Sequence, residues 1–197
     1  MNDSENTITE ERLEELFTAK HPNLAIVVGS RKAYNECNEH SLGASYEGHH
    51  YIDLETINGS DELRDVLKAL GWSDAEMEET FVQDYDSEYL TLHGCDDINP
   101  FDLADLIFDN CPTSNSDYWF EKLGAILEAE TSDIFDAVGY MKDYEYYSGQ
   151  DPEEYAERYV DDMYNVDDYV KRYIDYSSMA DDMDWITQTE NGLLVHY

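Results

Sequence analysis

The chain carries far more negative charge than folding requires. It holds 47 Asp and Glu residues against 11 Lys and Arg, which gives a formal net charge of -36 over 197 residues. Like charges on one compact body repel each other and weaken the folded state. Strongly acidic chains are usually disordered, but disordered chains have few aromatic residues. The 17 Tyr, 6 Phe and 3 Trp therefore indicate a folded core beneath an acidic surface.

The rest of the composition limits where the protein acts and what it binds. No apolar run approaches the roughly 18 residues that indicate a membrane span. The start Met-Asn-Asp-Ser-Glu lacks the features of a secretory signal, and three widely spaced cysteines argue against a disulfide framework. We therefore expect a cytoplasmic protein. Its charge would repel nucleic acid and anionic membranes, whereas a basic partner, or a protein that holds nucleic acid, would attract it.

The first part of the chain is predicted to hold an extension and one small domain. Residues 1–23 form the extension, with a polar helix that Thr7 and Glu10 cap and with an apolar stripe of Leu13, Leu16 and Phe17. Residues 24–87 form an N-terminal α+β domain, with one helix capped by Ser60 and a further turn opened by Ser73. Its predicted strands lie at 24–28, 42–46, 51–54 and 80–85.

Two further domains are predicted. Residues 88–131 form a central helical domain, in which Asn99-Pro100 and Ser116 begin helices. Residues 132–197 form a C-terminal α+β domain with helices near 134–141, 152–163 and 166–174, and it ends in a hairpin around Asn191-Gly192. The predicted fold class is thus α+β, in an elongated chain of three small domains.

The carboxylates fall mainly on the helix faces opposite the apolar stripes. Helical neighbours three or four residues apart place their Cβ atoms roughly 5–6 Å apart, which is similar to the spacing of phosphates on a DNA strand. A net charge of -36 matches roughly 60 Å of duplex DNA. The sequence therefore predicts a DNA-like surface. Its members are Asp102, Asp105, Asp109, Glu121, Glu128, Asp136, Glu153, Glu154, Glu157, Asp161, Asp162, Asp167, Asp168, Asp175, Asp181 and Asp182.

Other interpretations of the acidic residues stay open at this point. An acidic helix face is often only a solvated face, and halophilic proteins are acidic as well. The alternative function is an acidic, halophile-like or cation-binding enzyme or module. Asp84, Asp86 and Glu88 alternate as in a calcium loop, but the loop lacks the Gly and Glu that an EF-hand needs at its sixth and twelfth positions.

Catalytic and metal-binding patterns find little support. There is no Gly-x-Ser-x-Gly, phosphate loop or dinucleotide fingerprint. The nearest set of metal ligands is Cys37-x-x-His40 with His49-His50, but adjacent histidines on a strand point to opposite faces. We therefore expect no enzyme activity, no catalytic residues, no metal and no cofactor.

Several stretches resemble the ArdA antirestriction proteins, which are made by plasmids, transposons and phages. The resemblance covers about residues 24–197 and is strongest over the last thirty. Cys37 and Ser45 depart from the family pattern, and residues 1–22 are extra. The stretches that carry the resemblance are Lys32-Ala33-Tyr34-Asn35-Glu36, Leu42-Gly43-Ala44, Glu79 to Asp86, Tyr173-Ile174-Asp175-Tyr176, Asp182-Met183-Asp184 and Asn191-Gly192.

This resemblance implies a non-enzymatic DNA mimic. Proteins of this kind have three small domains in a curved, dimeric chain, and they occupy the DNA groove of type I restriction-modification enzymes, chiefly the methyltransferase core. The family's antirestriction motif maps to about Met163–Asp175, which is associated with dimerisation. The residues also favour a homodimer, because this segment offers more apolar surface than a short helix pair can bury. The predicted interface residues are Tyr164, Val166, Tyr169, Val170 and Tyr173.

Overall fold

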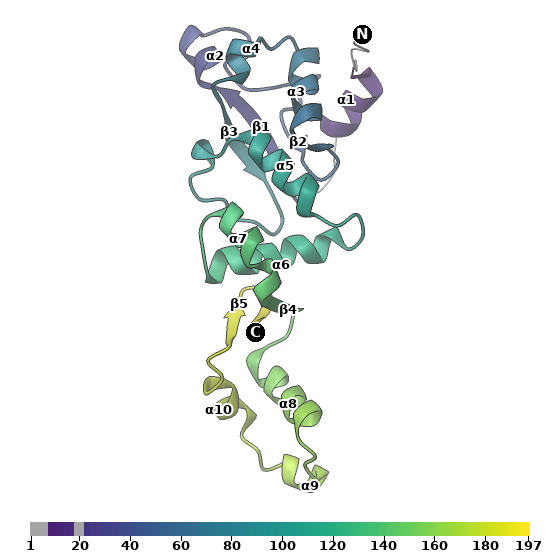
Figure 1. Cartoon of the computed structure of the whole chain (residues 1–197), viewed down its shortest axis with the longest axis vertical. Helices are drawn as coiled ribbons and strands as arrows, with labels where there is room; N and C mark the ends of the chain where they lie inside the picture. Colours follow the sequence, from purple (N-terminus) through teal and green to yellow (C-terminus); the bar gives the residue numbers. More distant parts are fainter. Residues whose placement is uncertain (1–7, 18–21) are drawn as a thin grey trace. The chain divides into compact units, whose positions relative to one another are not determined.

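A computed structural model of the protein describes residues 8–17 and 22–197 (Figure 1). The chain divides into two compact units, Met1–Ser116 and Asp117–Tyr197. Each unit contains one small three-stranded sheet in which all strand pairs are antiparallel. The predicted α+β class is therefore confirmed, whereas the division into three domains stays a prediction. No described helix combines the length and the apolar character that crossing a membrane requires.

The sheet of the first unit is built around strand β1 (Ala25–Ser30). All six residues of β1 are buried, and the strand lies between β2 (Ile52–Asp53) and β3 (Thr80–Asp86). An apolar, β-branched run suits such a central position. The helices of this unit are α1 (Glu10–Phe17), α2 (Arg31–Glu36), α3 (Gly59–Ala69), α4 (Asp74–Met77), the short 3₁₀ helix η1 (Cys95–Asp97) and α5 (Pro100–Asn110).

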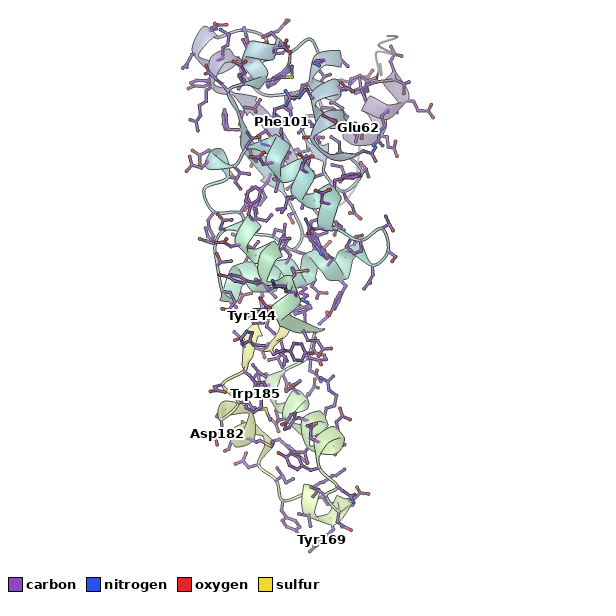
Figure 2. The ribbon with its side chains drawn as sticks, viewed as in Figure 1. Glu62, Phe101, Tyr144, Tyr169, Asp182 and Trp185 are labelled. Carbon is purple, nitrogen blue, oxygen red and sulfur yellow. The ribbon has the colours of Figure 1, made fainter. Side chains whose placement is uncertain are left out.

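The N-terminal helix α1 is an integral part of this unit. Leu13, Leu16 and Phe17, the predicted apolar stripe, are buried. Arg12 binds Glu62 of α3, which is labelled in Figure 2, at 2.8 Å and donates a further hydrogen bond to the carbonyl oxygen of Thr56 at 2.6 Å. The predicted helix is therefore confirmed over Glu10–Phe17, while Thr7 of its predicted cap lies outside the described residues.

The predicted strand at 42–46 is wrong. This segment is a loop with one isolated bridge between Tyr46 and His49. Gly43 has a φ of 94°, which no extended strand adopts, and Leu42 is exposed. Ala44 still donates a hydrogen bond to the carbonyl oxygen of Val28 at 2.8 Å. The loop thus lies against β1 without extending the sheet.

The helix starts in this unit follow the predicted caps, with one exception. Ser73 and Glu76 form a complete capping box at α4, and the side chain of Asn99 caps α5 ahead of Pro100. Helix α3, however, begins at Gly59, so the prediction that Ser60 is its cap is wrong. Ser60 instead donates its backbone N–H to Asp105 at 2.6 Å, so that a carboxylate of α5 satisfies the first turn of α3.

The sheet of the second unit is built around strand β6 (Gly192–His196). This strand lies between β4 (Tyr144–Ser148) and β5 (Ile186–Thr189). The sequence does not reveal β4, because its Tyr-Glu-Tyr-Tyr run follows a short helix without a clear break. The other elements are α6 (Ser116–Ala129), α7 (Ile134–Tyr140), the 3₁₀ helix η2 (Met141–Asp143), α8 (Pro152–Met163), α9 (Asp168–Lys171) and α10 (Tyr176–Asp181).

The predicted C-terminal hairpin is confirmed, but its glycine has a different role. Thr189 pairs with Gly192, so Glu190 and Asn191 form the loop and Gly192 is the first residue of β6. Gly192 has no positive φ. A Cβ atom there would overlap the carbonyl oxygen of Tyr147 and lie 2.8 Å from the Tyr146 hydroxyl oxygen. The position requires glycine because β4 approaches so closely.

Three predicted helices of the second unit differ in detail from the structure. Helix α7 buries Ile134 and Ala137 rather than Phe135, and α8 leaves Met163 exposed while it buries Tyr155. The predicted helix at 166–174 shortens to the single turn α9. These segments are rich in tyrosine and carboxylates, so the apolar period that indicates a buried face is weak there.

Candidate protein-interaction surfaces

The predicted DNA-like residues lie at the surface. Of the sixteen carboxylates, Glu121 is half-buried and the other fifteen are exposed. They come from α5 to α10 and the connections between these helices. Among the described residues only two carboxylates, Asp53 and Glu76, are buried. Nearly all of the described negative charge therefore faces solvent.

Helix α8 carries the densest group of these residues. Its buried face consists of Tyr155, Ala156 and Val160. Tyr155 and Ala156 belong to a core cluster of the second unit with Ala180, Met183, Leu193 and Val195. The opposite face exposes five carboxylates. We call this group the α8 acidic face, and it consists of Glu153, Glu154, Glu157, Asp161 and Asp162. Because a packed helix holds it, the array keeps a fixed spacing.

Some of the predicted residues also hold the fold together. Glu121 accepts hydrogen bonds from the hydroxyls of Ser148 at 2.6 Å and Tyr146 at 3.1 Å, and Glu128 accepts one from the backbone N–H of Glu190 at 3.1 Å. Asp167 and Asp175 cap α9 and α10 through their side chains. Hydrogen bonds from Ser178 lower the pKa of Asp175. Hydrogen bonds therefore fix these carboxylates in place.

Several basic residues are directed at aromatic rings and carbonyl oxygens. Arg31 lies 5.0 Å from the ring centre of Phe81, and Arg64 lies 4.4 Å from that of Phe101. Arg158 of α8 lies 4.0 Å from the ring centre of Tyr147. Cation–π contacts of this kind hold a positive charge close to the protein body.

Lys122 behaves in a similar way in the second unit. Its ammonium group donates a hydrogen bond to the carbonyl oxygen of Tyr144 at 2.6 Å. Burial lowers the pKa of Lys122. Lys122 and the three arginines thus contact aromatic rings or a carbonyl oxygen, and these contacts do not neutralise surface carboxylates.

Within the predicted interface segment Met163–Asp175, residues Met163–Tyr173 form an exposed apolar region. Met163, Tyr164, Tyr169, Val170 and Tyr173 are each at least half exposed, whereas Val166 is half-buried. The hydroxyl of Tyr173 donates to that of Tyr169 at 3.0 Å. Figure 2 shows Tyr169 at the end of the second unit, where α9 joins the chain leaving α8 to the chain entering α10.

This segment is also electrically neutral by itself. It contains two carboxylates, Asp167 and Asp168, and two bases, Lys171 and Arg172. The rest of the chain has a large excess of carboxylates. Met163–Tyr173 is therefore a part of the surface where the apolar side chains carry no local net charge.

The histidines and cysteines that sequence reasoning considered as metal ligands do not come together. His40 binds Glu76 at 3.0 Å and stacks on Trp72, with a distance of 5.2 Å between ring centres. Cys37 is exposed and ends α2. Within residues 8–17 and 22–197, no three His, Cys, Asp or Glu side chains form a group that could hold a metal ion.

A surface hollow of about 440 Å³ lies between β4 and the start of α8. Its lining includes Arg158 and one carboxylate, Glu154. Glycosidase chemistry needs two carboxylates on either side of the bond that is cleaved. The hollow therefore does not offer the arrangement that would favour the alternative of an acidic enzyme.

Comparison with protein families gives a match over most of the chain. A family model described as "Antirestriction protein (ArdA)" matches residues 26–194. No curated protein matches the chain significantly. The matched range includes most of both sheets, the α8 acidic face and the segment Met163–Tyr173, whereas α1 precedes it.

Proposed function

The chain belongs to the ArdA family of antirestriction proteins, and from this premise we propose that it inhibits type I restriction-modification enzymes by mimicking duplex DNA. Its carboxylates would occupy the DNA-binding groove of the methyltransferase core, in the cytoplasm of the bacterial host. The protein acts in this proposal as a binding protein without catalysis or cofactor. The observation that carries the proposal is the α8 acidic face, a fixed array of exposed carboxylates on a packed helix.

The physical basis is the exchange of ions. A groove that holds DNA binds phosphates with Lys and Arg, and it releases the counterions of both surfaces when it does so. A rigid array of carboxylates supports the same exchange. Because the array presents no base edges, binding should not depend on the target sequence of the enzyme.

Competition with DNA tests this proposal. Fluorescently labelled duplex bound to a type I methyltransferase core should be displaced by the protein, whether or not the duplex carries the recognition sequence. Raising the salt concentration from about 50 to 200 mM should weaken binding of the protein by orders of magnitude, if the protein replaces six to ten phosphate contacts. A stable ternary complex of enzyme, duplex and protein at saturation would instead indicate an allosteric inhibitor.

A set of charge variants tests the role of α8. Changing Glu153, Glu154 and Glu157 to Gln and Asp162 to Asn should reduce the slope of log K against log salt by about 3 to 4, if each side chain replaces one phosphate. The matched control neutralises four exposed carboxylates of the first unit, Glu10, Glu11, Asp96 and Asp97. If the slope falls equally in the two variants, total charge determines binding, and the α8 acidic face has no special role.

We also propose that Met163–Tyr173 binds the same segment of a second chain. Five large apolar side chains there are at least half exposed around a locally neutral charge pattern, which suits a two-fold contact between identical acidic molecules. Light scattering at micromolar concentration should give about twice the mass of the chain. Tyr173→Ser should shift the protein toward monomer, whereas Tyr34→Ser should not, because these tyrosines are 71% and 69% exposed on different units.

A further inference from the structure

Helix α9 exposes Tyr169 and Val170 to solvent and does not bury a side chain in the core. None of its four side chains is buried. The backbone N–H groups of Val170 and Lys171 both donate to the carbonyl oxygen of Asp167, at 2.8 and 3.1 Å, and that of Tyr169 donates to the Asp167 carboxylate at 2.8 Å. The hydrogen bonds of the turn are thus local. Isolated helical turns of this length are not stable in water. The shape of α9 therefore needs support from outside the turn.

An ion pair with α8 offers such support. The ammonium group of Lys171 lies 2.6 Å from a carboxylate oxygen of Asp161, and 3.7 Å from one of Asp168. The hydrogen bond to Asp161 raises the pKa of Lys171, so the lysine is fully charged at neutral pH. Asp161 is thus distinct from the other members of the α8 acidic face, because its charge already faces a cation of the same chain.

The pair lies where α8, α9 and α10 meet. Tyr176, the first residue of α10, packs against the core of the second unit, and its hydroxyl oxygen is buried. Burial raises the pKa of Tyr176, the carboxylates of Glu157 and Asp161 raise it further, and Lys171 opposes them. Lys171 therefore reaches from the exposed turn toward groups on both neighbouring helices.

We propose that Asp161 and Lys171 form a clasp that positions α9 for docking against a second copy of the chain. Lys171 is then a positioning residue, and Asp161 serves the interface rather than the DNA-like surface. The inference rests on the proposed dimer. Without the clasp, the segment Val166–Tyr173 would have to be ordered during association, and that ordering weakens binding.

Loss of the ion pair should change the dissociation constant of the dimer moderately, and the change should occur in both chains of a symmetric dimer. A partly exposed ion pair of this kind changes an equilibrium constant by roughly threefold. A two-fold dimer contains two clasps, one in each chain. Loss of both should therefore raise the dissociation constant of the dimer by about tenfold.

Two matched pairs of single variants test the clasp by sedimentation velocity. Lys171→Gln should weaken the dimer about tenfold, whereas Arg172→Gln, the same charge change one residue away, should have little effect. Asp161→Asn should match Lys171→Gln, whereas Asp162→Asn should not. The dimer of the double variant Asp161→Asn/Lys171→Gln should dissociate no more readily than that of either single variant, because the two substitutions remove the same interaction. The swapped pair Asp161→Lys/Lys171→Asp should recover part of the loss at unchanged net charge.

Amide hydrogen exchange gives a readout that does not depend on association. In a chain made monomeric by Tyr173→Ser, removing either member of the clasp should speed exchange at Val170 and Lys171. A wild-type chain that is monomeric at all concentrations overturns the dimer and the clasp's role in it. A wild-type dimer that weakens equally with Lys171→Gln and Arg172→Gln, or that responds to Lys171→Gln but not to Asp161→Asn, overturns the clasp alone.

Discussion

The carboxylate of Glu76 accepts a hydrogen bond from Nδ1 of His40 at 3.0 Å, and this contact ties the loop after α2 to helix α4. Glu76 is one of the two buried carboxylates among the described residues. It accepts further hydrogen bonds from the backbone N–H and hydroxyl of Ser73 and from the side chain of Asn38. The bonds from Ser73 contribute most to lowering the pKa of Glu76 to about 2.

Glu76→Gln should therefore destabilise the first unit at neutral pH. Loss of a buried, charged acceptor should lower the free energy of unfolding by about 2 kcal/mol. Urea denaturation at pH 7 measures this change. Glu78→Gln, at the exposed end of the same helix, should change the free energy by less than about 0.5 kcal/mol.

The same variant should lose its effect in acid. Because folding lowers the pKa of Glu76, its contribution is fully present above the ordinary pKa of 4.5 and is lost as the pH falls toward about 2. The difference in stability between wild type and Glu76→Gln should thus shrink between pH 5 and pH 2. A difference that stays constant over this range would contradict the charged state of Glu76.

Sodium chloride should stabilise the free protein. With nearly all described carboxylates exposed, self-repulsion opposes folding, and screening shortens its range from about 10 Å at 0.1 M salt to about 3 Å at 1 M. Calorimetry should show a melting temperature that rises with salt over this range. The melting temperature of the variant neutralised at Glu10, Glu11, Asp96 and Asp97 should rise less steeply with salt. A melting temperature of the wild type that falls with salt would refute the role of repulsion.

Gly192→Ala should destabilise the second unit by several kcal/mol. The added Cβ would overlap the carbonyl oxygen of Tyr147, a backbone atom that cannot move without disturbing β4. Gly139→Ala is the matched control, because a Cβ atom there meets nothing within 4 Å. In helix α7 it should stabilise by up to about 1 kcal/mol. Thermal unfolding of both variants should therefore shift in opposite directions.

Leu16→Ala should destabilise the first unit although α1 precedes the range that the family model matches. Leu16 is fully buried, and removal of a buried leucine side chain costs about 2–5 kcal/mol. Leu42→Ala, at a leucine that is 73% exposed, should be nearly neutral. If both variants unfold at the same urea concentration, α1 does not support the unit as the structure indicates.

Sequence reasoning succeeded where one local rule decided the structure. The central strand Ala25–Ser30, the capping box at Ser73 and the Asn99-Pro100 helix start each follow from a short pattern. The predicted stripe of α1 is also buried, since its three apolar residues are spaced for one helix face.

Sequence reasoning failed where distant contacts decided the structure. Asp105 lies 45 residues from Ser60, and no local pattern shows that it satisfies the start of α3. Strand β4 is held by its pairing with β6, and its own sequence alternates too weakly to reveal it. The sequence does not distinguish Asp161 from its acidic neighbours, because its contact with Lys171 depends on the tertiary fold. The acidic surface is predictable from the sequence because Asp and Glu side chains are almost always exposed to solvent unless a partner is buried with them.

The two sheets differ in when their central strands leave the ribosome. In the first unit β1 precedes β2 and β3, so each later strand finds its partner already synthesised. In the second unit β4 and β5 pair only with β6, which follows both of them. During translation the N-terminal sheet can therefore grow outward strand by strand, whereas the C-terminal sheet must assemble in one late step, once residues 192–196 have emerged.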